Sequence, residues 1–381
     1  MEKQQVTRRY DLDWLKVIAT LLVFLYHCSM FFNPFDWHVK NNELDSSVIL
    51  AFSLLIGTWI MPIFFVISGI SSYFSLQKRR MGTYMNERLL RLGIPLVFGV
   101  LILSPPQVYI ERLDNNQFTG SFLEFLPLAY KGLYLEIGAT GNFAFVGLHL
   151  WYLLALILFS FITMHLFNKT KSFKNVTPFH LILLHIALIA VAAFVETVHL
   201  GGWDLLVYLL LFLAGYYIFS SDQLLSLLKK TFPVHLILGL TAAISYALWF
   251  MLDFPERGSM AFTLFTSLAV IGSLNVILFF YYMADRYLSF SNKLLRYTSE
   301  ASLPFYILHQ PVIVIIGFLI KDWSWPISLK FIFLIVVSFL IIAFIYHFVI
   351  RTLPFLRILF GLRGKKRQAS LPPPAKPEVS I

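Results

Sequence analysis

The sequence predicts an all-α, polytopic membrane protein with about ten transmembrane helices and both termini in the cytoplasm. The first observation is composition: of 381 residues, 58% are hydrophobic and 13% are charged, against about 25% charged residues in a soluble domain. The second is a series of apolar runs of near-spanning length, and the third is the placement of basic residues between those runs. Together they assign the chain to a cell membrane before any motif is considered.

The apolar runs follow one another along almost the whole chain. A helix needs about 20 apolar residues to cross the hydrocarbon core of a bilayer. Runs near this length lie at residues 13–33, 49–73, 89–108, 145–167, 179–199, 203–220, 232–252, 260–282, 302–320 and 329–350. No small-residue cleavage site follows the first run, so we expect a retained span and not a signal peptide.

Basic residues set the predicted orientation. The terminal segments and the loops on their side carry 23 of the 30 Lys and Arg residues, and the opposite loops carry six. Because cytoplasmic loops are enriched in Lys and Arg, both termini are predicted to be cytoplasmic. We therefore expect a cytoplasmic N-terminus (1–12), a membrane domain (13–350) and a basic, proline-rich cytoplasmic tail (351–381). The longest outer loop, at about 109–144, exceeds what a connection needs and is expected to cover a site.

Three sequence features exclude whole classes of function. The single cysteine, Cys28, rules out an internal disulfide framework and a cysteine-based zinc cluster. The net charge of +10 does not indicate a nucleic-acid partner, because the basic residues lie in short loops and not on one face of a soluble domain. The histidines lack metal-ligand spacing such as H-E-x-x-H, so no metal site is expected.

An imidazole lies inside the first span. His27, in LLVFLYHCSMFF, is about 20 Å from the cytoplasmic start of that span, which places it in the outer half of the membrane. Ionisable residues at membrane depth are costly and mark functional sites. Because neutral imidazole is a good general base, His27 is the candidate catalytic base. The alternative is a histidine that only packs against a neighbouring helix.

Neighbours on the same span are poor partners for His27. Cys28 points about 100° away on a helix, which argues against a Cys–His nucleophile pair. Asp13 lies about 21 Å from His27 along the axis and cannot orient the imidazole. With Lys16 it flanks the cytoplasmic end of the span, where we expect it to cap and anchor the helix.

The stretch NERLLRLGIP places two guanidinium groups at the start of the third span. Arg88 and Arg91 are at positions i and i+3, hence on one helix face. Both arginines would also be expected simply as cytoplasmic anchors of the span under the positive-inside rule. Two guanidiniums on one face can also clamp phosphates by paired hydrogen bonds.

Further candidates lie in later spans. His149, in GLHLWYLL, begins the fourth span at the membrane level of His27, whereas His309, in ASLPFYILHQPV, is expected about 10 Å from the cytoplasmic start of the ninth span. Trp151 is expected in the interfacial aromatic belt, although aromatic faces near polar groups also suit sugar rings. The remaining membrane histidines are interpreted as structural: His165, His180, His185, His235 and His347.

Six stretches, in order, resemble the membrane-bound acyltransferase type 3 family over about residues 10–350. RRYDLDWLKVIATLLVFLYH carries Asp13, Lys16 and His27 at the spacing of the family's first span, with lysine where arginine is commoner. MPIFFVISGISSYF carries the phenylalanine–serine–glycine motif with Ser68, and RLLRLGIP carries the arginine pair. The stretches HLWYL, FLAGYYIF and ASLPFYILHQPV match later spans.

The resemblance implies an O-acyltransferase of a bacterial cytoplasmic membrane. FDWHVKNN and the run from Met61 to Pro95 are most similar to the glucan biosynthesis protein C branch, which is implied to put succinyl groups on periplasmic glucans. Cytoplasmic succinyl-CoA or acetyl-CoA would be a co-substrate with its phosphates against Arg88 and Arg91, and His27 would activate a glycan hydroxyl. No tightly bound cofactor is implied. The expected supporting residues are Asp13, Lys16, Ser68, His149, Trp151 and His309.

Two alternatives stay open at this point. A transporter or flippase could use His27 and His309 to bind a polar substrate or to carry protons. An enzyme of the same family could instead act on lipopolysaccharide, on exopolysaccharide or on a small metabolite. The ordered motifs favour the enzyme, with acyl-CoA, a glycan and the lipid bilayer as its partners.

Overall fold

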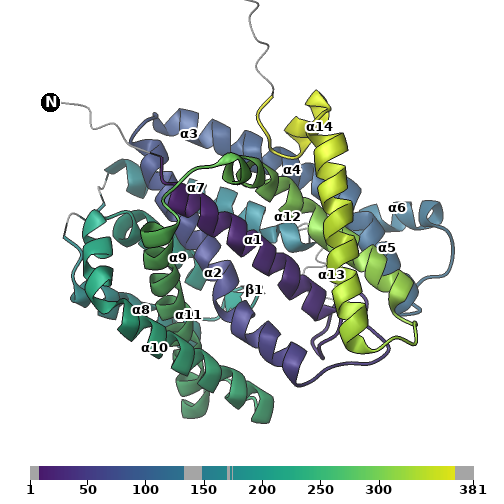
Figure 1. The fold of residues 1–381 in the computed structure, drawn as a ribbon, viewed down its shortest axis with the longest axis horizontal. Helices are drawn as coiled ribbons and strands as arrows, with labels where there is room; N and C mark the ends of the chain where they lie inside the picture. Colours follow the sequence, from purple (N-terminus) through teal and green to yellow (C-terminus); the bar gives the residue numbers. More distant parts are fainter. Residues whose placement is uncertain (1–7, 133–147, 170–171, 174, 365–381) are drawn as a thin grey trace, which may run out of the picture.

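The computed structural model describes residues 8–132, 148–169, 172–173 and 175–364, and it shows a bundle of long helices (Figure 1). The only strands among these residues form a two-residue hairpin, in which β1 (His199–Leu200) pairs antiparallel with β2 (Trp203–Asp204). The predicted all-α class is confirmed.

Among the described residues, eight helical segments are long and apolar enough to cross a membrane. They are α1 (Tyr10–Met30), α2 (Val48–Leu76), a continuous segment Met81–Asp114, η4 (Leu148–Leu150) with α7 (Trp151–Lys169), α10 (Asp222–Leu252), α11 (Met260–Tyr287), α12 (Lys293–Ile320), and α13 (Ile327–Phe344) with η6 (Ile345–Ile350). Two shorter apolar helices are α8 (Pro178–Phe194) and α9 (Leu205–Ala214), the latter extended by the π-helical turn η5 (Gly215–Phe219). These ten segments correspond to the ten predicted runs.

The segment Met81–Asp114 changes its helical type several times. It consists of α3 (Met81–Arg88), the π-helical η1 (Leu89–Gly93), α4 (Ile94–Phe98), the π-helical η2 (Gly99–Leu103) and α5 (Ser104–Asp114). Part of the predicted long outer loop is therefore helical: α5 runs on to Asp114, and α6 (Phe122–Gly132) follows. From residue 133 onwards the loop lies outside the described part of the chain.

The two ends of the described chain lie on the same side of the bundle, at the top of Figure 1. We call this the basic side and the opposite one the outer side. The predicted tail begins with an ordered element here, since α14 (Pro354–Leu359) contacts α4 and η6. The proline-rich part of that tail falls outside the described residues.

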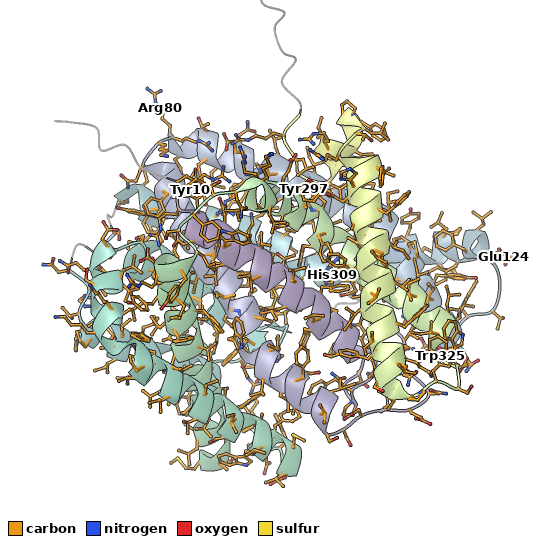
Figure 2. All side chains as sticks on the ribbon, in the orientation of Figure 1. Tyr10, Arg80, Glu124, Tyr297, His309 and Trp325 are labelled. Carbon is orange, nitrogen blue, oxygen red and sulfur yellow. The ribbon has the colours of Figure 1, made fainter. Side chains whose placement is uncertain are left out.

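The helix α12 starts earlier than expected, which changes the expected position of His309 along it. The apolar run begins near residue 302, but the helix already begins at Lys293 because Asn292 caps it, its side chain accepting a hydrogen bond from the backbone N–H of Leu295 at 2.7 Å. His309 is therefore about 24 Å from the start of the helix, and not about 10 Å. Figure 2 shows His309 in the middle of the bundle, between Tyr297 on the basic side and Trp325 on the outer side.

Helix α2 passes through the centre of the bundle and crosses η5 at very short range. A Cβ atom added at Gly69 would lie 2.1 Å from the carbonyl oxygen of Phe212, and one added at Gly215 would lie 2.3 Å from that of Val66. Small residues at such crossings let helix backbones approach closely in membranes. The glycine of the phenylalanine–serine–glycine motif is thus required by packing.

We predict that Gly69→Ala destabilises the protein by about 1–3 kcal/mol, the usual cost of overpacking, because backbone atoms of the neighbouring helix must move. Thermal unfolding in detergent measures this effect. Gly82→Ala is the matched control, since a Cβ there has no atom within 4 Å. Equal melting temperatures for the two variants would contradict the close crossing.

The distribution of basic residues predicts the orientation of this bundle. A reporter fused after Ile381 should be cytoplasmic, and a reporter inserted near Asn116, beyond the end of α5, should be extracytoplasmic. Accessibility to a membrane-impermeant reagent in whole cells tests both positions. Two reporters on the same side would contradict the arrangement of spans.

Candidate active site

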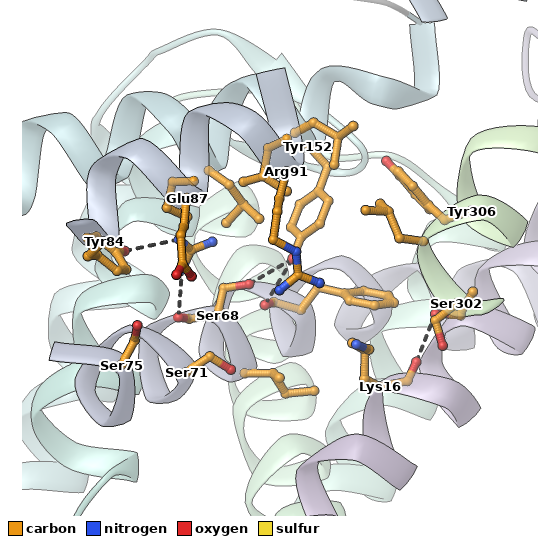
Figure 3. A pocket seen from close by; sticks show the side chains of 18 of the residues that line it. Lys16, Ser68, Ser71, Ser75, Tyr84, Glu87, Arg91, Tyr152, Ser302 and Tyr306 are labelled. Carbon is orange, nitrogen blue, oxygen red and sulfur yellow. Dashed lines mark hydrogen bonds between the residues drawn. The ribbon is translucent and has the colours of Figure 1, made fainter. Parts of the chain in front are cut away.

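A cavity of about 360 Å³ lies on the basic side between α1, α2, α3, α7 and α12. Its walls carry serine hydroxyls and several cationic side chains. Figure 3 shows Lys16 and Arg91 reaching into it from different helices. The cationic residues that line it are Lys16, Arg79, Arg88, Arg91 and Arg363.

The two arginines of the predicted pair both line this cavity, but they are held differently. Arg88 donates from Nη2 to Ser72 Oγ at 2.6 Å and from Nε to Tyr84 Oη at 3.1 Å. Arg91 makes no hydrogen bond or ion pair with the described residues. The wide turn of η1 separates the two side chains more than an α-helix would. Arg91 is therefore the guanidinium that is free to bind a ligand.

The inner end of the cavity is closed by tyrosine side chains. Tyr152 and Ser68 share a hydrogen bond of 2.8 Å between their hydroxyl oxygens. The Tyr306 hydroxyl donates to the backbone carbonyl of His149, and the Tyr306 ring centroid lies 5.5 Å from that of His309 and 5.6 Å from that of His149. One aromatic ring thus separates the cavity from a group of histidines.

His27, His149 and His309 come together at membrane depth. His309 Nε2 lies 3.1 Å from His27 Nδ1, and the ring centroids of these residues are 4.8 Å apart. The ring centroid of His149 is 5.0 Å from that of His309. The structure therefore unites three histidines that the sequence places on three different spans.

Hydrogen bonds fix which nitrogen of His27 carries its proton. His309 Nδ1 faces the Tyr306 carbonyl, which can only accept, so in neutral His309 the Nε2 atom holds a lone pair. His27 Nδ1 then faces two acceptors, His309 Nε2 and the Val23 carbonyl oxygen at 2.9 Å. Nδ1 of His27 must therefore be the protonated nitrogen. Its Nε2, which has no partner among the described residues, keeps the lone pair of a base.

His149 also presents a lone pair toward this site. Its Nε2 donates to the Ile307 carbonyl at 3.1 Å, and its buried Nδ1 has no partner among the described residues. The preceding Leu148 has a φ of 53°, in the left-handed region that non-glycine residues seldom adopt. Backbone strain of this kind is often found at functional sites.

Four residues on the outer side of the histidines were not singled out from the sequence: Trp37, His38, Glu111 and Gln310. His38 Nδ1 pairs with the carboxylate of Glu111, and Gln310 Nε2 lies 2.8 Å from His38 Nε2. The ring of Trp37 has its centroid 6.5 Å from that of His27. A carboxylate at the end of an apolar run and the polar stretch FDWH were the available signals for this cluster.

Two lysines hold the outer loop that carries Trp37 and His38. Lys40 Nζ donates to the backbone carbonyls of Met30 and Phe35, and burial lowers the pKa of Lys40 to about 8. The fully buried Lys330 Nζ donates to the side-chain oxygens of Asn41 at 2.9 Å and Asn42 at 2.8 Å. The loop is thereby tied to the ends of α1 and α13.

The remaining candidates divide into two groups. Lys16 and Ser68 line the cavity on the basic side. Asp13 lies outside it, pairs with Arg8 at 2.8 Å and makes no capping hydrogen bond. Trp151 is buried against Phe65 and Tyr208 and does not form an exposed aromatic belt. Cys28 is buried and free.

The described residues contain no group of three His, Cys, Asp or Glu side chains that could hold a metal ion. Acid–base chemistry by imidazoles, next to a cationic cavity, is what this arrangement of described residues offers.

The chain is similar to known proteins over almost its whole length. Residues 9–347 match the type 3 family model described as an acyltransferase domain. The glucans biosynthesis protein C of Salmonella heidelberg and that of Salmonella gallinarum are each 23% identical to this chain over 403 aligned positions, covering 97% of this chain and 99% of the relative. No solved structure matches this chain.

Proposed function

Because the chain belongs to the acyltransferase type 3 family, we propose that this multi-pass membrane acyltransferase moves a succinyl or acetyl group from cytoplasmic acyl-CoA to a hydroxyl of an extracytoplasmic glycan. The name of its relatives, which refers to glucans, supports a glucan as the acceptor. The observation that carries the proposal is the position of the histidine group, one tyrosine ring beyond the end of a cationic cavity.

The cavity on the basic side is the proposed donor site. Acyl-CoA carries phosphates at one end and the thioester at the other, joined by a flexible arm. Arg91 and Lys16 have no ion pair with the described residues and would bind the phosphates. His27 is about 16 Å further along α1 than Lys16, so the arm would run along the helix toward Tyr306.

His27 Nε2 is the proposed general base. It would take the proton of the acceptor hydroxyl while the oxygen attacks the thioester carbon, so that a C–O bond forms and the C–S bond breaks. The proton would then pass from His27 to the departing thiolate. During the reaction the imidazolium would be stabilised at Nδ1 by the Val23 carbonyl and by His309, which makes His309 a positioning residue.

The acceptor would approach from the outer side. Trp37, next to His27, and His38, held by Glu111, lie on that side of the histidines. Aromatic and polar side chains together suit a sugar. His149 Nδ1 is available to accept a hydrogen bond from a substrate N–H or O–H group.

We predict that replacing Arg88 and Arg91 with alanine raises the KM for acyl-CoA far more than the KM for the acceptor. Each charge-assisted hydrogen bond contributes about 1.5–3 kcal/mol, so Arg91→Ala alone should weaken donor binding roughly 10- to 100-fold. Arg91→Lys should restore only part of the affinity, because the planar fork is lost. Donor binding to the purified protein in detergent measures both effects.

Arg80→Ala is the control for this experiment. It removes the same charge from the same side of the protein, but Arg80 is exposed and does not line the cavity. Because Arg88 also ties α3 to α2, its single variant should lose stability as well as affinity. Unchanged donor affinity in the double variant would show that the pair is only an anchor.

We predict that His27→Gln lowers kcat by roughly 10²–10⁴-fold, the usual contribution of a positioned base, while the protein stays folded in the membrane. His309→Ala should lower kcat less, because the Val23 carbonyl still holds Nδ1 of His27. Acyl transfer to a glucan, with melting temperature measured in parallel, tests both variants.

His185→Gln is a matched histidine control, since His185 bonds to Asn275 at 2.9 Å and does not belong to the histidine group of the site. It should lose stability without a comparable loss of kcat. A glutamine variant at position 27 with near wild-type turnover would make His27 a packing residue, and the base would have to be sought at His149 or His309.

A further inference from the structure

A second cavity, of 490 Å³, lies on the outer side, and the reaction proposed above makes no use of it. It is bounded by the outer ends of α1, α2, α8, α10 and α11 and by the hairpin β1–β2. Several aromatic rings line it, among them those of Tyr26, Phe35, Trp203, Tyr246, Phe250 and Phe265.

Three hydroxyl groups on this wall have no hydrogen-bond partner among the described residues: those of Tyr26, Tyr246 and Thr266. Thr266 is only 7% exposed. On the same helix, Thr263 and Ser267 each donate to the carbonyl four residues earlier, at 3.3 and 2.7 Å, whereas Thr266 does not. The two tyrosine side chains are half-buried, and none of the three hydroxyl oxygens is fully enclosed, so all three can pair with a polar ligand that enters the cavity.

The mouth of the cavity carries a loosely paired ion cluster. Asp204 is 5% exposed, and its Oδ2 lies 3.7 Å from both Arg257 Nη2 and His199 Nδ1. These distances are longer than direct hydrogen bonds, so the carboxylate oxygen and the guanidinium can still bind a further group. Arg257 also pairs with Glu196 at 3.1 Å, so the cationic charge at the mouth is matched by carboxylates.

A sugar ring fits this chemistry better than a phosphate or an alkyl chain. Its C–H faces match aromatic walls, and its hydroxyls can both donate to and accept from tyrosine, threonine, carboxylate and guanidinium groups. A phosphate would meet the carboxylates at the mouth, and an alkyl chain would leave three hydroxyls unpaired. A mostly apolar cavity with a few convergent polar groups is typical of small-ligand sites.

We propose that this cavity binds a glycosyl unit of the acceptor, separate from the unit that receives the acyl group. The inference rests on the proposed function, because it takes the acceptor to be a glycan. The cavity is close to the base: Tyr26 and His27 are consecutive on α1, with ring centroids 5.4 Å apart. Phe35 of the cavity and Trp37 beside His27 belong to the same loop.

With this geometry, the affinity for the acceptor should depend on the number of linked sugars. A chain of linked sugars can place one unit in the outer cavity and another at His27, and a single sugar cannot occupy both positions. The outer cavity therefore supplies affinity for a polymer without touching the reacting atoms. Its loss should raise the KM for a long acceptor and leave kcat at saturating acceptor unaffected.

The test removes the three unpaired hydroxyls without changing the aromatic wall. The triple variant Tyr26→Phe, Tyr246→Phe and Thr266→Val is combined with His27→Gln, so that binding is measured without turnover. The full chain in lipid nanodiscs is titrated with linear glucose oligosaccharides and with glucose. Oligosaccharide affinity should fall at least tenfold, at roughly threefold to tenfold for each hydroxyl. Thr263→Val is the matched control and should bind like the parent, because Thr263 does not line the cavity.

The possible results distinguish a failure of this inference from a failure of the proposed function. Unchanged oligosaccharide affinity in the triple variant, with an altered amount of co-purified lipid, would show that the cavity holds a lipid chain and would overturn the inference. Unchanged affinity and unchanged lipid would overturn it as well. If the chain with His27 intact acylates no glycan, the proposed function fails, and the binding titration still decides whether the cavity binds sugar.

Discussion

The arrangement of the whole site depends on the contact between Nδ1 of His27 and Nε2 of His309. In the hydrocarbon region little water is available, so the nitrogens of an imidazole depend largely on partners within the protein. His27 finds the Val23 carbonyl and His309, and His309 in turn finds the Tyr306 carbonyl. Because carbonyls only accept, this chain of contacts leaves a lone pair on Nε2 of the half-buried His27 ring. A polar group that is costly in a membrane thus becomes a base with a fixed tautomer.

Close packing keeps α1 and α12 in the register that this contact requires. A Cβ atom at Gly317 of α12 would lie 3.1 Å from the ring of Phe31, so a glycine there lets the end of α1 pack directly on α12. On the other side of α1, Gly69 and Gly215 bring α2 against η5. Small residues at these crossings replace the hydrophobic driving force that helices lack in lipid. The glycines therefore allow the close helix packing that brings His27 and His309 into contact.

The spans could be predicted from the sequence, because hydropathy and charge are local signals. Motif spacing, which is also local, could indicate His27, Arg88 and Arg91 as candidate site residues. The meeting of His309 with His27 was not predictable, since it depends on a polar first stretch that makes α12 start at Lys293. Arg88 is hydrogen-bonded and Arg91 is not, because of the π-helical turn η1 and the hydrogen bond from Arg88 to Ser72. Neither feature can be predicted from the spacing of the two arginines. The pair of His38 and Glu111 joins residues 73 apart, and no periodicity links them.

The two cavities differ in charge, and under the proposed function this difference suits a donor and an acceptor that arrive from opposite sides of the membrane. The cavity on the basic side gathers arginine and lysine, and Arg91 there is unpaired among the described residues, which suits phosphates. The outer cavity is aromatic, with its few charges matched by opposite ones. Carrying the phosphates of a donor across hydrocarbon would be far costlier than carrying an acyl group. On the proposed function, the protein holds the charged part of the donor on one side and passes only the acyl carbon beyond Tyr306. His309, and with it His27, lies in the middle of the bundle, where a carbon arriving from one side can meet an oxygen arriving from the other.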